Sequence, residues 1–182
     1  MRAYSDLYVD EIMWNQGDAF LCIREQLPGV DEQWFIKAYL QSNMRRLLDH
    51  ANPKYAAMPP LELVDYFIRW ECGGEYQKGQ PWWGFLPQWA GVVCSLYQWT
   101  YSIRSFDLIN LVSFADFERI YPALHQMGWD GAVRKIHDEV IPMPVDKEKA
   151  LVNAWMDDVR PLLGDEYFIK MADNGASPVV IQ

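Results

Sequence analysis

The sequence predicts an all-α protein, a compact multi-helix domain built around one central buried helix at about residues 87–103. Between residues 79 and 103 the chain contains no Asp, Glu, Lys or Arg. Within this run, small or uncharged polar residues recur every three or four positions and form one line along a helix: Gly84, Gln88, Gly91, Ser95, Gln98, Ser102 and Ser105. The other faces are apolar, which is typical of a helix at the centre of a domain. The chain also lacks any long series of alternating polar and apolar residues, so we expect no β-sheet.

Three helices are expected before the central one. Suitable first residues or N-caps mark their starts, at Ser5, Asp31 and Pro60. Proline and glycine mark their ends, at Pro28-Gly29, Asn52-Pro53 and Gly73-Gly74. Apolar residues keep helical spacing along each segment, although Gly17 weakens the middle of the first helix.

Four further helices are expected after the central one. Residues that favour N-caps mark their starts, at Ser105, Ser113, Asp130 and Asp146. They end at about Leu111, Tyr121, Ile141 and Leu162, and the last three are followed by Pro122, Pro142 and Gly164. We expect residues 165–182 to form a short strand or an irregular tail. Because no polar flexible linker divides the chain, residues 1–182 are predicted to be a single domain.

Composition limits the classes of function. The formal net charge of −9 argues against a protein that binds nucleic acid by neutralising its phosphates. The short basic segments Arg45-Arg46 and Arg134-Lys135 are more typical of solvated helix faces. Three cysteines without CxxC spacing, and an N-terminus without an apolar signal region, predict a cytoplasmic protein. The uncharged run is interrupted by prolines and is shorter after Pro87 than the roughly 20 residues that span a bilayer, so no membrane segment is expected.

Catalytic motifs are absent from the sequence. There is no GxxxxGK[ST] loop, GxGxxG, GxSxG or HExxH. Cys72 beside two glycines could serve as a nucleophile with His50 or His125 as its base, but a packing cysteine is the stronger interpretation. Consecutive residues such as His137-Asp138-Glu139 point in different directions on a helix and cannot chelate one ion together. We therefore expect no enzyme activity, no cofactor and no metal.

Acidic and aromatic residues are the candidates for binding a partner. Glu11, Asp18 and Glu25 are seven residues apart and share one side of the first helix, at steps of about 10 Å. Asp10 adjoins this row, a second acidic group surrounds the end of the last helix, and two tryptophans precede the central helix. The candidates are therefore Asp10, Glu11, Asp18, Glu25, Asp157, Asp158, Asp165, Glu166, Trp82 and Trp83. Carboxylates in such rows suit a basic partner surface. The alternative is a solvated face that keeps the domain soluble.

Three stretches carry a resemblance to a known family. They are the opening MRAYSDLYVDEIM, the NPKY from Asn52 to Tyr55, and WAGVVCSLYQW…RSF…YPALH from Trp89 to His125. These stretches resemble a family of small proteins from gut bacteria and their mobile elements, and within it the metagenome-derived anti-CRISPR proteins that inhibit the type II RNA-guided nuclease. The shared residues form core and turns, so no functional residue is carried over.

The resemblance implies a non-enzymatic inhibitor that binds the type II CRISPR nuclease with its guide RNA and prevents DNA engagement or cleavage. Such nucleases hold nucleic acid in positively charged channels, which an acidic protein could occupy. The net charge does not favour direct contact with nucleic acid. The alternative is an antitoxin-like or adaptor protein that binds another bacterial protein encoded in a mobile-element gene cluster.

Overall fold

The computed structural model describes residues 4–82, 84–141 and 144–163. Apart from one isolated β-bridge between Val30 and Lys78, the regular secondary structure in these ranges is helical, which confirms the predicted all-α class. Its elements, in chain order, are η1 (Asp6–Tyr8), α1 (Val9–Gln26), α2 (Glu32–Leu40), α3 (Asn43–Asp49), α4 (Pro53–Ala56), α5 (Pro60–Tyr66), η2 (Phe67–Glu71), α6 (Leu86–Tyr101), α7 (Ser105–Leu111), α8 (Phe114–Leu124), α9 (Trp129–Lys135), η3 (Ile136–Val140) and α10 (Val145–Leu163). The turns η2 and η3 are single π-helical turns that continue α5 and α9. The predicted tail at 165–182 lies outside the described residues.

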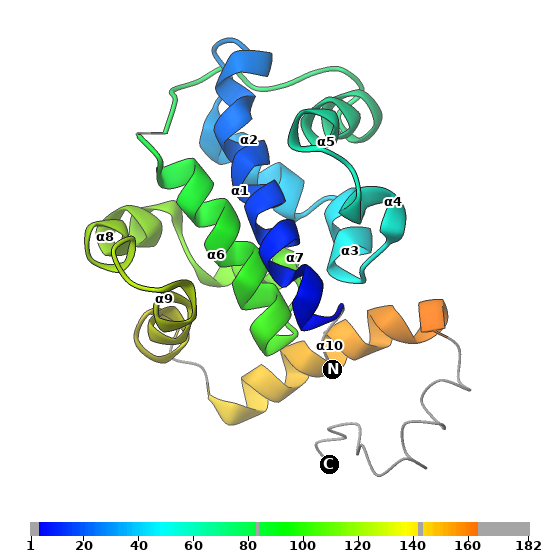
Figure 1. Ribbon diagram of the computed structural model, residues 1–182, viewed down its shortest axis with the longest axis vertical. Helices are drawn as coiled ribbons and strands as arrows, with labels where there is room; N and C mark the ends of the chain where they lie inside the picture. Colours follow the sequence, from blue (N-terminus) through cyan, green and yellow to red (C-terminus); the bar gives the residue numbers. More distant parts are fainter. Residues whose placement is uncertain (1–3, 83, 142–143, 164–182) are drawn as a thin grey trace.

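Helices α1 and α6 lie side by side through the middle of the molecule (Figure 1). They run antiparallel, since Tyr4 contacts Trp99 near one end and Asp18 contacts Gln88 toward the other. Along α6 every side chain is buried except those of Gln88, Thr100 and Tyr101. The expectation of a central buried helix is therefore confirmed, with bounds one or two residues from those predicted.

Two glycines bring the backbones of α1 and α6 together. A Cβ atom on Gly91 would lie 2.9 Å from the carbonyl oxygen of Gln16 and 2.9 Å from the Cα atom of Gly17. A Cβ atom on Gly17 would lie 2.6 Å from Cγ2 of Val92. Distances this short are steric overlaps, so the helices could not approach as they do with any larger residue at either position.

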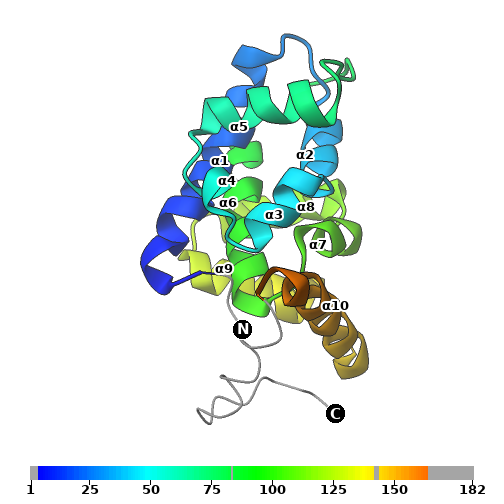
Figure 2. The ribbon, with the colours of Figure 1, turned by 90° about the vertical axis from the view of Figure 1, so that its right-hand side faces the viewer.

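The other helices cover this pair. Helices α8 and α9 lie on one side, and α3, α4 and α5 lie on the other (Figure 1). Helix α10 crosses the end of α6, as both views show (Figures 1 and 2). Two backbone hydrogen bonds, Asp31 N to Gln77 O at 2.9 Å and Gly79 N to Gly29 O at 3.1 Å, fix the turn-rich segment before α6 against the start of α2. None of the helices in the described ranges combines the length and the hydropathy that a membrane span requires.

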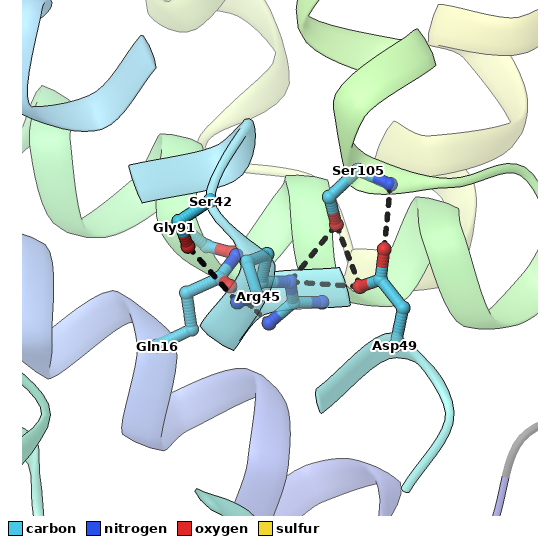
Figure 3. A network of polar contacts seen from close by, with 6 residues as sticks. All are labelled: Gln16, Ser42, Arg45, Asp49, Gly91 and Ser105. Atoms are coloured by element: carbon cyan, nitrogen blue, oxygen red, sulfur yellow. Dashed lines mark hydrogen bonds and ion pairs between the residues drawn. The ribbon is translucent and has the colours of Figure 1, made fainter. Parts of the chain in front are cut away.

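A buried polar network lies where α1, α3, α6 and α7 meet (Figure 3). Arg45 forms an ion pair with Asp49 at 2.8 Å and donates to Oγ of Ser105 at 2.9 Å and to the side-chain oxygen of Gln16. Asp49 accepts from the backbone N–H and the hydroxyl of Ser105, both at 2.8 Å. Gln16 donates to the carbonyl of Gly91 at 2.7 Å. Because Arg45 and Asp49 are both 1 % exposed, removing one partner would leave a buried charge unpaired, which typically costs about 3–5 kcal/mol.

Several expectations from the sequence are corrected. Ser105, Asp130 and Asp146 are not N-caps but helical residues, since α7 begins at Ser105 and α9 and α10 begin at Trp129 and Val145. The segment expected as one helix from Asp31 is two, because Ser42 accepts a hydrogen bond from the N–H of Arg45 and caps a new helix. Arg45 belongs to the core and not to a solvated basic face. Helix α8 continues through Pro122 to Leu124.

Helix α10 is attached to the body by a few side chains. Trp155 is buried, and its ring centroid lies 5.7 Å from that of His50. Oδ2 of Asp158 lies 3.4 Å from Nη1 of Arg104, and Oε1 of Glu148 lies 3.9 Å from Nε2 of His137. Neither ring nitrogen of His50 has a hydrogen-bond partner among the described residues.

We expect Gly91→Ala to lower the free energy of unfolding by about 1–3 kcal/mol, because the added methyl group overlaps backbone atoms of α1. Gly131→Ala in α9 is the matched control, since its Cβ would meet only the flexible end of Met127, at 3.4 Å. That control should gain up to about 1 kcal/mol from helix propensity. Urea denaturation followed by circular dichroism measures both changes, and a Gly91→Ala variant as stable as the parent would contradict the proposed contact.

We expect His50 to make the fold sensitive to mild acid. Burial lowers the pKa of His50. The carboxylates of Asp49 and Asp158 raise this pKa, and the nearby cations Arg46 and Arg104 lower it further. The unfolded chain, with a histidine pKa of about 6.5, therefore binds a proton that the folded chain resists. Stability should fall as the pH drops from 7 through 6.5 toward the lower folded pKa. Thermal melts of the parent, His50→Phe and the exposed-histidine control His125→Gln test this, and an equal acid loss in all three would refute it.

Candidate partner-binding surface

The outward face of α1 presents carboxylates on both sides of a tryptophan. Asp10, Trp14 and Asp18 follow one another at four-residue spacing and so lie on one line of the helix. Asp10 and Glu11 are exposed, Trp14 is 41 % exposed, and Asp18 is half-buried. This face is charged and partly open to solvent, and it borders the contact with α6, because Asp18 accepts a hydrogen bond from Gln88 of α6.

The local sequence explains why the helix begins where it does. The Ser5 side chain accepts from the N–H of Leu7 at 3.4 Å and caps η1, which leads directly into α1. Asp10 and Glu11 lie in the first turn of α1, where negative charge interacts favourably with the helix dipole. Asp18 accepts from the side-chain amide of Gln88 at 2.8 Å, which fixes this carboxylate relative to α6.

Two adjoining grooves run along this face. One, of about 480 Å³, lies between α1 and the 56–60 segment, and Trp14, Met58 and Pro59 are among its lining residues. The other, of about 410 Å³, lies toward the N-terminus and includes Tyr4 and Tyr8. The two grooves share Glu11, Ala56 and Ala57. Asn15 donates to the carbonyl of Met58 at 2.8 Å and so fixes one wall of the first groove to α1.

The electrostatics of the surface are one-sided. Neither groove has Lys or Arg among its described lining residues, whereas Asp10, Glu11 and Asp18 all line the first. Lys54, the cation of the neighbouring α4, donates to the Tyr66 hydroxyl at 3.1 Å and lies over the Tyr66 ring at 4.3 Å. The carboxylates of the first groove thus have no cation beside them in its described lining, and the groove is locally negative.

The remaining predicted residues are dispersed. Glu25 is exposed but near the other end of α1 and outside both grooves. Asp157 is exposed on α10, and Asp158 pairs with Arg104. Trp83, Asp165 and Glu166 lie outside the described residues.

The prediction that Trp82 lies on a contact surface is corrected, because the structure places this residue in the core. Its side chain is 3 % exposed, and Nε1 donates to Glu118 at 2.7 Å. Its ring lies edge to face with that of Phe114, at 5.1 Å between centroids. Two adjacent tryptophans in a turn-rich segment give no periodic signal that separates a core position from a surface position.

Sequence analysis missed Trp14, Tyr8 and the wall formed by residues 56–60. A signal for Trp14 was available, because it stands midway between two of the predicted carboxylates. The wall comes from a segment about forty residues further along the chain, which the spacing of residues within one helix cannot reveal.

Neither histidine that could serve Cys72 as a base is hydrogen-bonded to it: among the described residues the ring nitrogens of His50 have no partner, and Nδ1 of His125 contacts the carbonyl oxygen of Tyr121 at 2.7 Å. Burial raises the pKa of the Cys72 thiol, with a further contribution from Glu71. Burial, followed by Glu25 and Asp18, also raises the pKa of Cys22, and burial raises the pKa of Cys94 to about 12. A raised pKa disfavours the thiolate form, which is the nucleophilic form of cysteine. Within the described ranges, no three His, Cys, Asp or Glu side chains converge as a metal site would require.

No protein-family model, curated protein or solved structure matches the chain. The family resemblance of the opening, NPKY and central-helix stretches therefore stays a prediction.

Proposed function

We propose that this protein is a non-enzymatic inhibitor that binds a type II CRISPR RNA-guided nuclease and prevents DNA engagement or cleavage. One observation carries the proposal: a locally negative, partly aromatic groove lies along α1 of a protein whose net charge is −9. A nuclease of this class holds nucleic acid in positively charged channels, so opposite charges would speed and orient association. The sequence resemblance to anti-CRISPR proteins supports the same partner.

The alternative function is that of an antitoxin-like or adaptor protein. Two exposed apolar side chains just before α1 favour it: Leu7 is 85 % exposed, and Tyr8, which lines the second groove, is 56 % exposed. Such side chains suit a protein partner of any function. Copurification with guide-loaded nuclease, compared with copurification with a toxin encoded beside this gene, distinguishes the two functions.

Inhibition should be stoichiometric. In a reconstituted DNA-cleavage reaction, activity should fall in proportion to the ratio of this protein to nuclease and should reach its minimum when the binding sites are filled. Treating the inhibitor with a strong chelator, and removing the chelator before the nuclease is added, should leave inhibition unchanged. Complete inhibition far below one copy per nuclease, with a covalent change in nuclease, guide or DNA, would contradict the proposal.

Association should depend on the carboxylates of α1 and on salt. Reversing Glu11, Asp18 and Glu25 together to Lys should slow association with the nuclease by about tenfold or more at low salt, because steering by opposite charges is lost. The difference should shrink at high salt as screening increases. Reversal of three exposed carboxylates elsewhere, Glu62, Glu75 and Asp130, is a control with the same change in net charge. Equal association rates for the two folded variants would return the α1 carboxylates to the role of a solvated face.

A further inference from the structure

We propose that the first groove, between α1 and the 56–60 segment, binds an arginine-containing segment of a partner protein. The guanidinium stacks on Trp14 between the carboxylates of Asp10 and Asp18. This inference deepens the proposed function and rests on it for the identity of the natural partner. It specifies the chemistry that the groove recognises.

The spacing along α1 suits a guanidinium. Residues four apart on a helix are separated by about 6 Å along its axis, so Asp10 and Asp18 lie on α1 about one turn before and one turn after Trp14. A cation above an indole face is attracted to the ring, and a carboxylate beside the ring can accept hydrogen bonds from the same cation. The groove therefore combines stacking with charge pairing at one point.

The Trp14 ring is held in place before any partner binds. It meets the Trp129 ring edge to face, with centroids 5.3 Å apart and planes at 89°. Asp18 is likewise held by Gln88, and the 56–60 wall by Asn15. Trp14 and Asp18 therefore have little side-chain freedom to lose on binding, which favours affinity for a small contact area.

Arginine fits the groove better than lysine. A guanidinium is planar, stacks on aromatic rings and donates to carboxylates in pairs, whereas an ammonium is a compact and strongly hydrated charge. The apolar wall at Met58 and Pro59 can cover the aliphatic part of the side chain and a neighbouring apolar residue of the partner.

The charges also select the class of partner. Nucleic acid would place phosphates against Asp10, Glu11 and Asp18, and like charges at an interface oppose binding. A second copy of this chain would bring another net charge of −9 to the same face. A basic protein segment satisfies the carboxylates and covers the apolar wall together.

A short fluorescent peptide in which arginine and leucine alternate is the probe, used with the full chain and no nuclease. Its affinity for the parent is measured by fluorescence anisotropy at low and high salt. Peptides with citrulline or lysine in place of arginine report the contributions of charge and of the planar group. Trp14→Leu, and the pair Asp10→Asn with Asp18→Asn, should each weaken arginine-peptide binding by about tenfold or more, since each removes one of the two interactions.

Matched variants test whether such losses are specific. Trp70→Leu removes an indole that is 72 % exposed on η2, and Glu62→Gln with Glu75→Gln removes two exposed charges outside the grooves. Both should bind the peptide as the parent does. Melting curves establish that every variant is folded, and the double Asn variant, which keeps the tryptophan pair intact, remains informative if Trp14→Leu is unstable.

Several results would overturn the inference. They are no binding of the arginine peptide, equal binding of the citrulline peptide, and equal losses in the control variants. Duplex DNA that binds the parent in a Trp14-dependent way would assign the groove to nucleic acid instead, and a dimer that Trp14→Leu dissociates would assign it to a second copy.

A nuclease assay separates this inference from the proposed function. If the parent inhibits the nuclease and both groove variants inhibit it equally well, the groove is not the contact and only this inference fails. If the peptide binds as expected and the nuclease is not inhibited, the proposed function fails while the groove keeps its specificity.

Discussion

The close backbone contact between α1 and α6 at Gly17 and Gly91 is the constraint on which the rest of the structure depends. It allows Gln16 to reach the carbonyl of Gly91 and Asp18 to accept from Gln88, so one short stretch of α1 is fixed to the most buried helix of the protein. Arg45 then joins α3 to the same place through Gln16, and Asp49 joins it to α7 through Ser105. Packing and polar contacts thus act at a single crossing of four helices.

The candidate surface lies on the exposed face of the same helix, α1. Gln16 and Gly17 face the core, and Trp14 and Asp18 border the groove, within five consecutive residues of one helix. A helix fixed so firmly on its inner side presents its outer side chains in a defined arrangement, as binding sites on rigid elements require. The groove wall is fixed less extensively, through Asn15 and the short α4. We therefore infer that α1 sets the spacing of the recognised groups and the 56–60 segment sets the width.

Much of the fold could be predicted because it follows from local chemistry. The uncharged run located α6, Asp31 accepts from the N–H of Trp34 as its N-cap role requires, and Ser113 with Asp116 forms a complete capping box. Arg45 could not be recognised as buried, because a pair such as Arg45 and Asp49 at four-residue spacing is equally typical of an exposed helix face, and the partners Gln16 and Ser105 are remote in sequence. Gly17 was interpreted as a weak point of its helix, although its lack of a side chain is what allows α1 and α6 to approach closely. Of the candidate site, the acidic residues were visible in the sequence, but the groove required the tertiary arrangement.

The Arg45–Asp49 pair has a consequence for how this sequence can change over time. Each residue is held in place by the other, so the first of two substitutions passes through a state with an isolated buried charge, whichever residue changes first. A well-packed apolar pair of similar volume can nevertheless be as stable as a buried ion pair. The two states can thus be comparable in stability yet separated by an unfavourable intermediate. Drift should therefore leave this pair untouched for long periods or replace both members almost together, while exposed positions such as Glu62 vary freely.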